Sequence, residues 1–227
     1  MSRDCANEVV VLLHGLGRTP LDTWVLANAA KREGYKVLNW AYPSTRYGID
    51  KLSDMLSREI LRFHEADAIH FVGHSLGGLV ERRLLATAPP PNAGRLVMIG
   101  SPNAGAWIAE TLGDLWLFKK LFGPVGQELR RGPRGQCTLL GKPHSEFGII
   151  AGGTGRTRGM NPFLPGDNDC TVTVAETWLE GAADFIVLPY PHLIIQAFPR
   201  TIRNTLHFLR HGHFLDGKCP CAHCDAR

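Results

Sequence analysis

The stretch AIHFVGHSLGGLVERRLL at residues 68–85 decides the fold class, because it runs from a short apolar segment directly into a helical pattern. The apolar segment, 68–72, predicts a buried β-strand, and apolar side chains then recur every three to four positions, as in a helix. A sharp strand-to-helix turn raises a serine hydroxyl above the sheet, where a base can take its proton. Gly73 and Gly77 allow the close approach of strand and helix that this turn needs. We therefore predict that Ser75 is a nucleophile.

Apolar segments with helical segments between them recur along the whole chain, which indicates a parallel sheet covered on both faces. The run from Val9 to Leu13 is continuous and not alternating, as expected for a strand buried on both sides. The sequence predicts an α/β fold with a mostly parallel sheet of about six strands. The predicted strands are 8–13, 35–40, 68–72, 95–99, 147–151 and 184–188, and the predicted helices are 22–32, 48–64, 76–88 and 199–210.

Size and composition predict a single domain over residues 1–227, since no Ser-, Pro- or Gly-rich linker divides the chain. The net charge of +4 is scattered, apart from a few arginines in 130–134, which argues against nucleic-acid binding. No apolar run approaches the ~20 residues of a membrane span, and no basic-then-apolar leader precedes Val9. We expect no stable membrane insertion and a cytoplasmic location, and the oligomeric state is unknown.

The cysteines fall into two groups, three dispersed along the chain and three crowded into the end of the sequence, CPCAHCDAR. We expect the dispersed cysteines to be reduced thiols and residues 215–227 to be a flexible tail. With His223, the tail could supply soft ligands for zinc, but its spacing departs from two-residue gaps on both sides and no second ligand pair is evident elsewhere. The tail cysteines are Cys219, Cys221 and Cys224.

The regular alternation breaks over residues 103–142, and this insert is rich in aromatic and large aliphatic side chains. One interpretation is a core helix followed by a long loop. The other is a cap or lid over an acyl-binding pocket, whose apolar lining holds a substrate chain. For this second interpretation we predict that Trp116, Phe118 and Phe122 bind substrate.

Five segments together point to one family. The sequence resembles the α/β-hydrolase superfamily, specifically its small bacterial lipase and esterase branch, and the resemblance runs from Val9 to about Phe214. The segments are HGLG at 14–17, GHSLGG at 73–78, GSPNAG at 100–105, GDNDCTVTV at 166–174 and His192 in LPYPHLII.

The resemblance implies an oxyanion hole made by the backbone amides of Leu16 and Leu76, with His14 supporting the first loop. It also favours Asp169 as the acid, because the acid of similar esterases precedes Gly-Thr-Val. Here Asp169 precedes Cys-Thr-Val, and the cysteine puts this turn in doubt if its backbone needs positive φ. Spacing alone leaves Asp167 as the alternative acid.

Ten histidines compete for the role of base. His192 lies just beyond the predicted strand 184–188, at the carboxyl edge where the loops of such a sheet meet, and we predict that it is the base. His74 neighbours the nucleophile and is interpreted as a flanking residue of the turn.

These residues predict a serine esterase or lipase that acts on a small-molecule ester through an acyl-enzyme. The predicted reaction needs no metal or organic cofactor. An acyltransferase or thioesterase with the same three residues is the neighbouring alternative, and a non-catalytic binding module on the same fold is a less favoured one. Neither the length of the acyl chain nor the identity of the alcohol can be inferred from the sequence.

Overall fold

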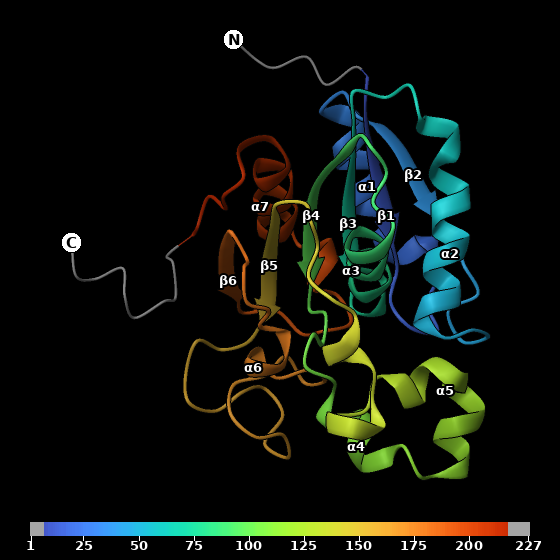
Figure 1. Ribbon diagram of the computed structural model, residues 1–227. Coiled ribbons are helices and arrows are strands. Elements are labelled where there is room, and N and C mark those ends of the chain that lie inside the picture. The colour runs from blue at the N-terminus through green and yellow to red at the C-terminus, as the bar shows by residue number, and fades with distance from the viewer. Residues whose placement is uncertain (1–6, 218–227) are drawn as a thin grey trace.

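The computed structural model describes residues 7–217, and its central feature is a six-stranded sheet in the order β2-β1-β3-β4-β5-β6 (Figure 1). Every pairing between neighbouring strands is parallel. The predicted α/β fold is therefore confirmed, with a sheet that is parallel throughout. The strands are β1 (Glu8–Leu13), β2 (Lys36–Trp40), β3 (Ala68–His74), β4 (Ala93–Ile99), β5 (Phe147–Gly152) and β6 (Asp184–Leu188).

Helices cover both faces of this sheet. On one face lie α2 (Ile49–Ile60) and α3 (Leu76–Thr87), and on the other lie α1 (Trp24–Arg32) and α7 (Pro199–His211). Alternate side chains of β1 enter the two cores, and all six residues of that strand are buried. A strand covered on both sides has no solvent face for polar side chains, which explains its continuous apolar run.

Some element boundaries differ from the prediction. The predicted helix 22–32 is divided into a 3₁₀ turn, η1 (Pro20–Thr23), and α1, because a proline at the first helical position starts the turn early. The predicted helix 48–64 is α2 followed by a second 3₁₀ turn, η2 (Leu61–Phe63). β3 continues two residues further, to His74, because its pairing with β4 extends that far.

The strand order places a crevice at the carboxyl ends of β1 and β3. β2 lies beside β1 on one side and β3 lies beside it on the other. The chain therefore leaves β1 toward one edge of the sheet and continues, after β2, on the opposite side of β1. Such a switch point is where α/β sheets usually bind ligands. Ser75 follows β3 directly, and the loop 14–17 follows β1, so both predicted site segments border this crevice.

The insert 103–142 lies at the carboxyl edge of the sheet and covers neither face (Figure 1). A Glu176 side-chain oxygen accepts a hydrogen bond of 2.7 Å from the Trp107 amide and ties the insert to the short helix between β5 and β6. Gly123 breaks the second helix of the insert, with φ +61°, and a Cβ there would lie 1.9 Å from the Thr45 carbonyl oxygen. The elements of this edge are α4 (Trp107–Leu112), α5 (Trp116–Glu128), η3 (Gly132–Arg134), η4 (Cys137–Leu139), α6 (Val174–Thr177) and η5 (Ile195–Ala197).

The start of the predicted tail is bound to α7, because Asp216 accepts hydrogen bonds from Arg200 at 2.9 Å and from Asn204 at 2.7 Å. The cysteine cluster of the tail, and the zinc site considered for it, lie outside the described residues. Within residues 7–217, no group of three or more His, Cys, Asp or Glu side chains is arranged to hold a metal ion. No helix in the described part of the chain is long and apolar enough to cross a membrane.

Candidate active site

Ser75 occupies a strained turn between β3 and α3. Its φ of 54° and ψ of −118° lie outside the regions that residues with a Cβ usually adopt. The surrounding glycines make this turn possible: a Cβ on Gly73 would lie 2.1 Å from the Gly78 nitrogen, and one on Gly77 would lie 2.5 Å from the Leu13 carbonyl oxygen. The turn therefore needs glycine at both positions, as the sequence pattern indicates.

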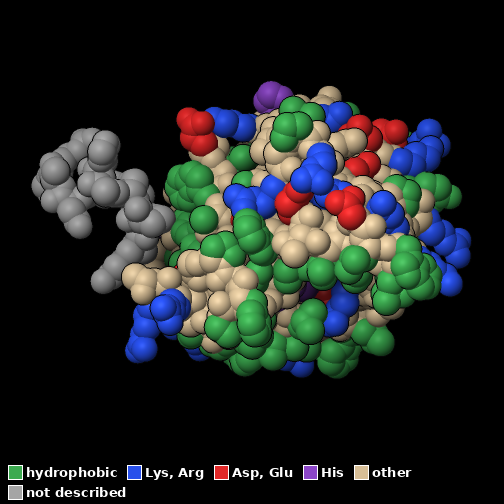
Figure 2. Space-filling view, turned by 90° about the horizontal axis from the view of Figure 1, so that it is seen from below, with side chains coloured by type: hydrophobic (Ala, Val, Ile, Leu, Met, Phe, Trp, Pro, Cys, Tyr) green, Lys and Arg blue, Asp and Glu red, His purple; other side chains and the backbone are tan. Residues whose placement is uncertain are grey.

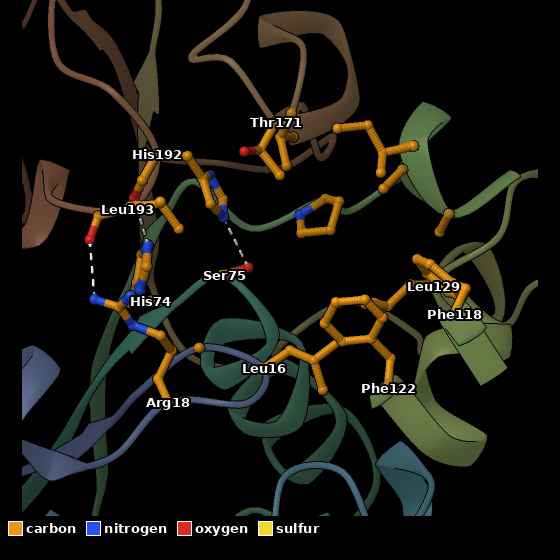
Figure 3. Close-up of a pocket in the computed structure, with 16 residues that line it drawn as sticks. Leu16, Arg18, His74, Ser75, Phe118, Phe122, Leu129, Thr171, His192 and Leu193 are labelled. Atoms are coloured by element: carbon orange, nitrogen blue, oxygen red, sulfur yellow. Dashed lines mark hydrogen bonds between the residues drawn. The ribbon is translucent and has the colours of Figure 1, made fainter. Parts of the chain in front are cut away.

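His192 lies between Ser75 and Asp169, and Figure 3 shows its ring directed at the Ser75 hydroxyl. Its Nε2 is 3.1 Å from the Ser75 Oγ, and its Nδ1 is 2.7 Å from an oxygen of the Asp169 carboxylate. The other Asp169 oxygen accepts hydrogen bonds from the amides of Thr171 and Val172, at 3.0 and 2.7 Å. When the Nδ1–H donates a hydrogen bond to the carboxylate, the Nε2 lone pair faces the serine hydroxyl. The structure thus brings the three predicted residues together in an arrangement that can move the serine proton.

Asp167, the alternative acid, faces away from this histidine. One of its oxygens accepts hydrogen bonds from the amide and the hydroxyl of Thr154, at 2.7 and 3.0 Å. The other accepts one from the Gly155 amide at 2.8 Å. These contacts organise the loop after β5, the usual work of an aspartate in a glycine-rich turn.

The cysteine that departs from the family pattern does adopt the conformation that glycine favours. Cys170 has a φ of 83°. The loop is held there because the Cys170 amide donates to the Asn168 side chain at 3.1 Å and its carbonyl accepts from Asn161 at 3.2 Å. A residue with a Cβ in the left-handed region costs about 1–2 kcal/mol, so this turn is strained beside Asp169.

The two amides predicted to form an oxyanion hole both lie at the crevice. Leu76 begins α3, and Leu16 lines the cavity beside Ser75. Among the described residues, neither amide donates a hydrogen bond to a protein acceptor. Amides at the start of a helix or in a fixed loop can stabilise a developing oxyanion without reorganising.

The loop that carries Leu16 is fixed by its neighbours. The Tyr42 hydroxyl donates a hydrogen bond of 2.6 Å to the His14 carbonyl, and the two rings stack with centroids 4.3 Å apart. The Gly17 amide donates to the Ser44 hydroxyl at 3.0 Å. His14 therefore lies in a supporting position, with its ring turned to Tyr42 and not to Ser75.

A cavity of about 210 Å³ opens beside Ser75 and His192, and the insert forms one wall of it. Phe118 and Phe122, one helical turn apart on α5, both line this cavity. Trp116 does not line it and is 70% exposed. Residues two apart on a helix point to nearly opposite sides, so the helical period could have separated Trp116 from the two phenylalanines.

The outer surface of the insert is also apolar. Viewed from below, green side chains spread over the face of the molecule at the carboxyl edge of the sheet (Figure 2). The exposed large side chains of α4, α5 and their connection are Trp107, Leu112, Leu115, Trp116, Leu117 and Leu121.

A second histidine–carboxylate pair lies beside the first, and the sequence analysis missed it. The His74 Nδ1 is 2.9 Å from an oxygen of Asp22, and its Nε2 is 2.9 Å from the His192 carbonyl oxygen. Asp22 is contributed by η1, 52 positions earlier in the chain than His74. No motif marks Asp22, although its position soon after β1 places it at the same edge of the sheet.

The surroundings of this pair shift both pKa values. Burial lowers the pKa of the His74 imidazole, and the hydrogen bond to Asp22 opposes that lowering. Burial alone would raise the pKa of Asp22, but the hydrogen bonds from His74 and Arg18 outweigh it and hold the pKa at about 2. Asp22 is therefore ionised over the whole neutral range.

The parallel sheet, the crevice and the sharp turn that carries Ser75 define the α/β-hydrolase fold. The chain belongs to the alpha/beta hydrolase family, because the sequence profile of that family matches residues 10–216. Among curated proteins, no sequence matches this chain.

Solved structures of other proteins share the fold at low sequence identity. The mature lipase BlEst2 of Bacillus licheniformis has a TM-score of 0.68 at 18% identity, covering 92% of this chain and 93% of the lipase. A gene product of Listeria innocua, lin2722, has a TM-score of 0.62 at 18% identity, with coverage of 91% and 95%. The metagenomic carboxyl esterase MGS0156 has a TM-score of 0.60 at 17% identity, with coverage of 84% and 66%. At these identities, the likeness establishes the fold.

Proposed function

We propose that the protein is a serine hydrolase that cleaves carboxylic esters, with Ser75 as nucleophile, His192 as base and Asp169 as the acid that orients it. The observation that carries this proposal is the pair of contacts that His192 makes, from Nε2 to the serine Oγ at 3.1 Å and from Nδ1 to the buried carboxylate at 2.7 Å. Solved relatives of the same fold that are described as a lipase and a carboxyl esterase support the choice of reaction.

In the proposed reaction, the Ser75 Oγ attacks the ester carbonyl carbon while His192 Nε2 takes the hydroxyl proton. The carbonyl oxygen becomes an oxyanion, and the amides of Leu16 and Leu76 are the donors proposed to stabilise it. The tetrahedral intermediate collapses, the bond to the leaving alkoxide breaks, and His192 returns the proton to it. A water molecule then repeats the sequence on the acyl-enzyme and releases the acid.

The cavity favours an ester with one slender apolar chain. Its volume of about 210 Å³ lies below the roughly 300–1,000 Å³ typical of sites for drug-sized ligands. Side chains such as Phe118, Phe122 and Val172 supply its lining next to the serine. We propose that this wall holds the acyl group during the reaction.

A covalent probe tests the proposed chemistry. A fluorophosphonate is expected to label the wild-type protein at Ser75, and Ser75→Ala should abolish both labelling and hydrolysis of chromogenic esters. Thermal melting of Ser75→Ala serves as the control for folding. Turnover by a folded Ser75→Ala protein within about tenfold of wild type would contradict the mechanism, because binding and oxyanion stabilisation alone leave orders of magnitude less.

A chain-length series tests the acyl pocket. Phe122→Ala should lower kcat/KM for an octanoyl ester about tenfold relative to an acetyl ester, because two lost methylene contacts are worth about 0.8 kcal/mol each. Trp116→Ala is the matched control, since this side chain lies on the same helix but outside the cavity lining. An equal fall for both esters in Phe122→Ala, accompanied by a lower Tm, would indicate a core residue and no acyl contact.

A further inference from the structure

His74 connects two parts of the site that are far apart in the sequence. It immediately precedes Ser75 at the end of β3, and its ring lies against the loop of His192, with the two ring centroids 5.1 Å apart (Figure 3). Its Nε2 lies 2.9 Å from the His192 backbone carbonyl oxygen, 118 positions along the chain. This one side chain therefore joins the strand of the nucleophile to the backbone of the base.

The other side of the His74 ring is held by Asp22. An oxygen of the carboxylate lies 2.9 Å from Nδ1, and both side chains are almost fully buried, with 2% and 1% exposed. The second Asp22 oxygen accepts from Arg18 Nε at 2.9 Å and from Gln196 Nε2 at 2.7 Å. Asp22 is thus itself held from two directions and cannot rotate away from the ring without breaking these contacts.

The same cluster also holds the residue after His192. An Arg18 nitrogen lies 3.2 Å from the Leu193 carbonyl oxygen, and the Gln196 amide nitrogen lies 3.3 Å from it. Two consecutive carbonyls of the His192 loop therefore accept hydrogen bonds from one set of neighbouring side chains.

His74 cannot act as a second base in this arrangement. Both of its nitrogens face acceptors, a carboxylate on one side and a peptide carbonyl on the other, so neither presents a lone pair to Ser75. What the ring can do is set where the His192 backbone lies relative to the nucleophile. Displacements of about 1 Å between reacting groups can cost on the order of 10²-fold in rate, so such a contact has kinetic consequences.

We propose that His74 and Asp22 form a positioning pair that holds the His192 loop so that its imidazole stays within hydrogen-bond distance of Ser75. The proposal rests on the proposed function, since it assigns His192 as the base. It adds two residues that contact neither the serine hydroxyl nor the acid Asp169, and it gives the conspicuous histidine of the GHSLG segment a role distinct from catalysis.

Two isosteric substitutions separate this role from a purely structural one. In His74→Gln, the side-chain amide nitrogen can reach the position of Nε2 and keep the hydrogen bond to the His192 carbonyl. In His74→Asn, the shorter side chain can reach the position of Nδ1 and keeps the contact with Asp22 instead. We expect His74→Asn to lower kcat and the rate of fluorophosphonate labelling at least tenfold, with KM for an acetyl ester within twofold of wild type. His74→Gln should stay within about threefold of wild type in all three.

Substitutions of Asp22 give an independent test if the turn tolerates no change at position 74. Asp22→Asn keeps an oxygen that can accept from Nδ1, whereas Asp22→Ala removes it. We expect Asp22→Ala to lower kcat about tenfold at unchanged KM, and Asp22→Asn to recover most of that loss. Melting temperatures are measured for all four variants, because a purely structural pair predicts that activity follows stability and that KM changes with kcat.

The outcomes distinguish failure of the pair from failure of the proposed function. If the wild-type protein is labelled at Ser75 while His74→Asn and His74→Gln react at equal rates, the positioning pair is overturned and the hydrolase remains. Activity that follows Tm across the four variants overturns it as well. If the wild-type protein is neither labelled nor active on any ester of the series, both proposals are overturned together.

Discussion

Two histidine–carboxylate pairs lie side by side at the carboxyl edge of the sheet, and they differ in what the second ring nitrogen faces. In both pairs Nδ1 contacts the carboxylate, at 2.7 Å for His192–Asp169 and 2.9 Å for His74–Asp22, and all four side chains are buried. The His192 Nε2 faces the Ser75 hydroxyl, whereas the His74 Nε2 faces a peptide carbonyl. A hydroxyl has a proton to give and a carbonyl has none, so the proposed roles are proton transfer for the His192 pair and support for the His74 pair.

The carboxylates of the two pairs are also held in different ways. Asp169 accepts two backbone amides of its own loop, so its orientation follows from a local turn. Asp22 accepts the side chains of Arg18 and Gln196, which come from opposite ends of the chain. Local backbone donors fix the first carboxylate, and tertiary contacts fix the second.

The largest expected effect is a difference in kcat between substitutions of the two carboxylates, Asp169 and Asp22. Asp169→Asn should lower kcat by roughly 10³–10⁴, because the amide no longer holds the tautomer in which Nε2 accepts the serine proton. Asp22→Asn should lower it by less than tenfold. Both are measured on a chromogenic acetyl ester beside fluorophosphonate labelling, with Asp167→Asn as the control, which should stay within about tenfold of wild type. A loss in Asp22→Asn as large as that in Asp169→Asn would show that the two pairs do not differ in role.

A second expected effect concerns acid stability and the Asp22 pair. The pKa of Asp22 is about 2 in the folded protein and 3.8 ordinarily, so the folded state favours the ionised form. The stability that this provides is fully present above about pH 4 and is lost as the pH falls through about 2. The difference in Tm between wild type and Asp22→Asn should therefore shrink as the pH falls from about 4 toward 2. A difference that stays the same down to pH 2 would mean that Asp22 is not held as an ion by its neighbours.

The smallest expected effect tests the strained turn beside Asp169. Cys170→Gly should relieve about 1–2 kcal/mol of strain in the left-handed backbone conformation. Glycine also gives the unfolded chain more conformational entropy, which lowers the free energy of unfolding by about 0.4–1 kcal/mol. The net gain of about 0.5–1 kcal/mol corresponds to a rise of roughly 1–4 °C in Tm. Cys170→Ser, which keeps the Cβ, is the control and should leave Tm unchanged. Equal Tm values for the glycine and serine variants would show that the loop carries no such strain.

Most of the fold could be predicted from local patterns. All six predicted strands are present, because continuous apolar runs such as that of β1 are distinctive when both faces are covered. The turn at Ser75 was predicted as well, since Gly73 and Gly77 are required by contacts within one strand–turn–helix unit. Helix ends were less well predicted, because the 3₁₀ turns at η1 and η2 continue the same apolar spacing.

Of the two histidine–carboxylate contacts between distant parts of the chain, one was predicted and the other was not. His192 and Asp169 were placed by their position after strands and by a family pattern, and the structure brings them together. The pair of His74 with Asp22 was not predicted, since its members are 52 positions apart and neither belongs to a periodic pattern. Trp116 was grouped with the cavity residues because aromatic content was counted without the direction of each side chain along α5.

The sequence by itself determined the parallel sheet and the strained serine turn, because each depends on apolar periodicity or on glycines a few positions apart. Asp169 and His192 were proposed from their positions after strands and from the resemblance to the family. Only the tertiary structure decided which partner each histidine faces, which aromatic side chains of the insert reach the cavity, and how Asp22 meets the loop of His192. These features depend on contacts between segments that converge at one edge of the sheet. There, a shift of one segment by an ångström, or a rotation of a helix about its axis, gives a side chain a different partner. Such distances are set when the strands pair and the helices pack, and no local pattern records them.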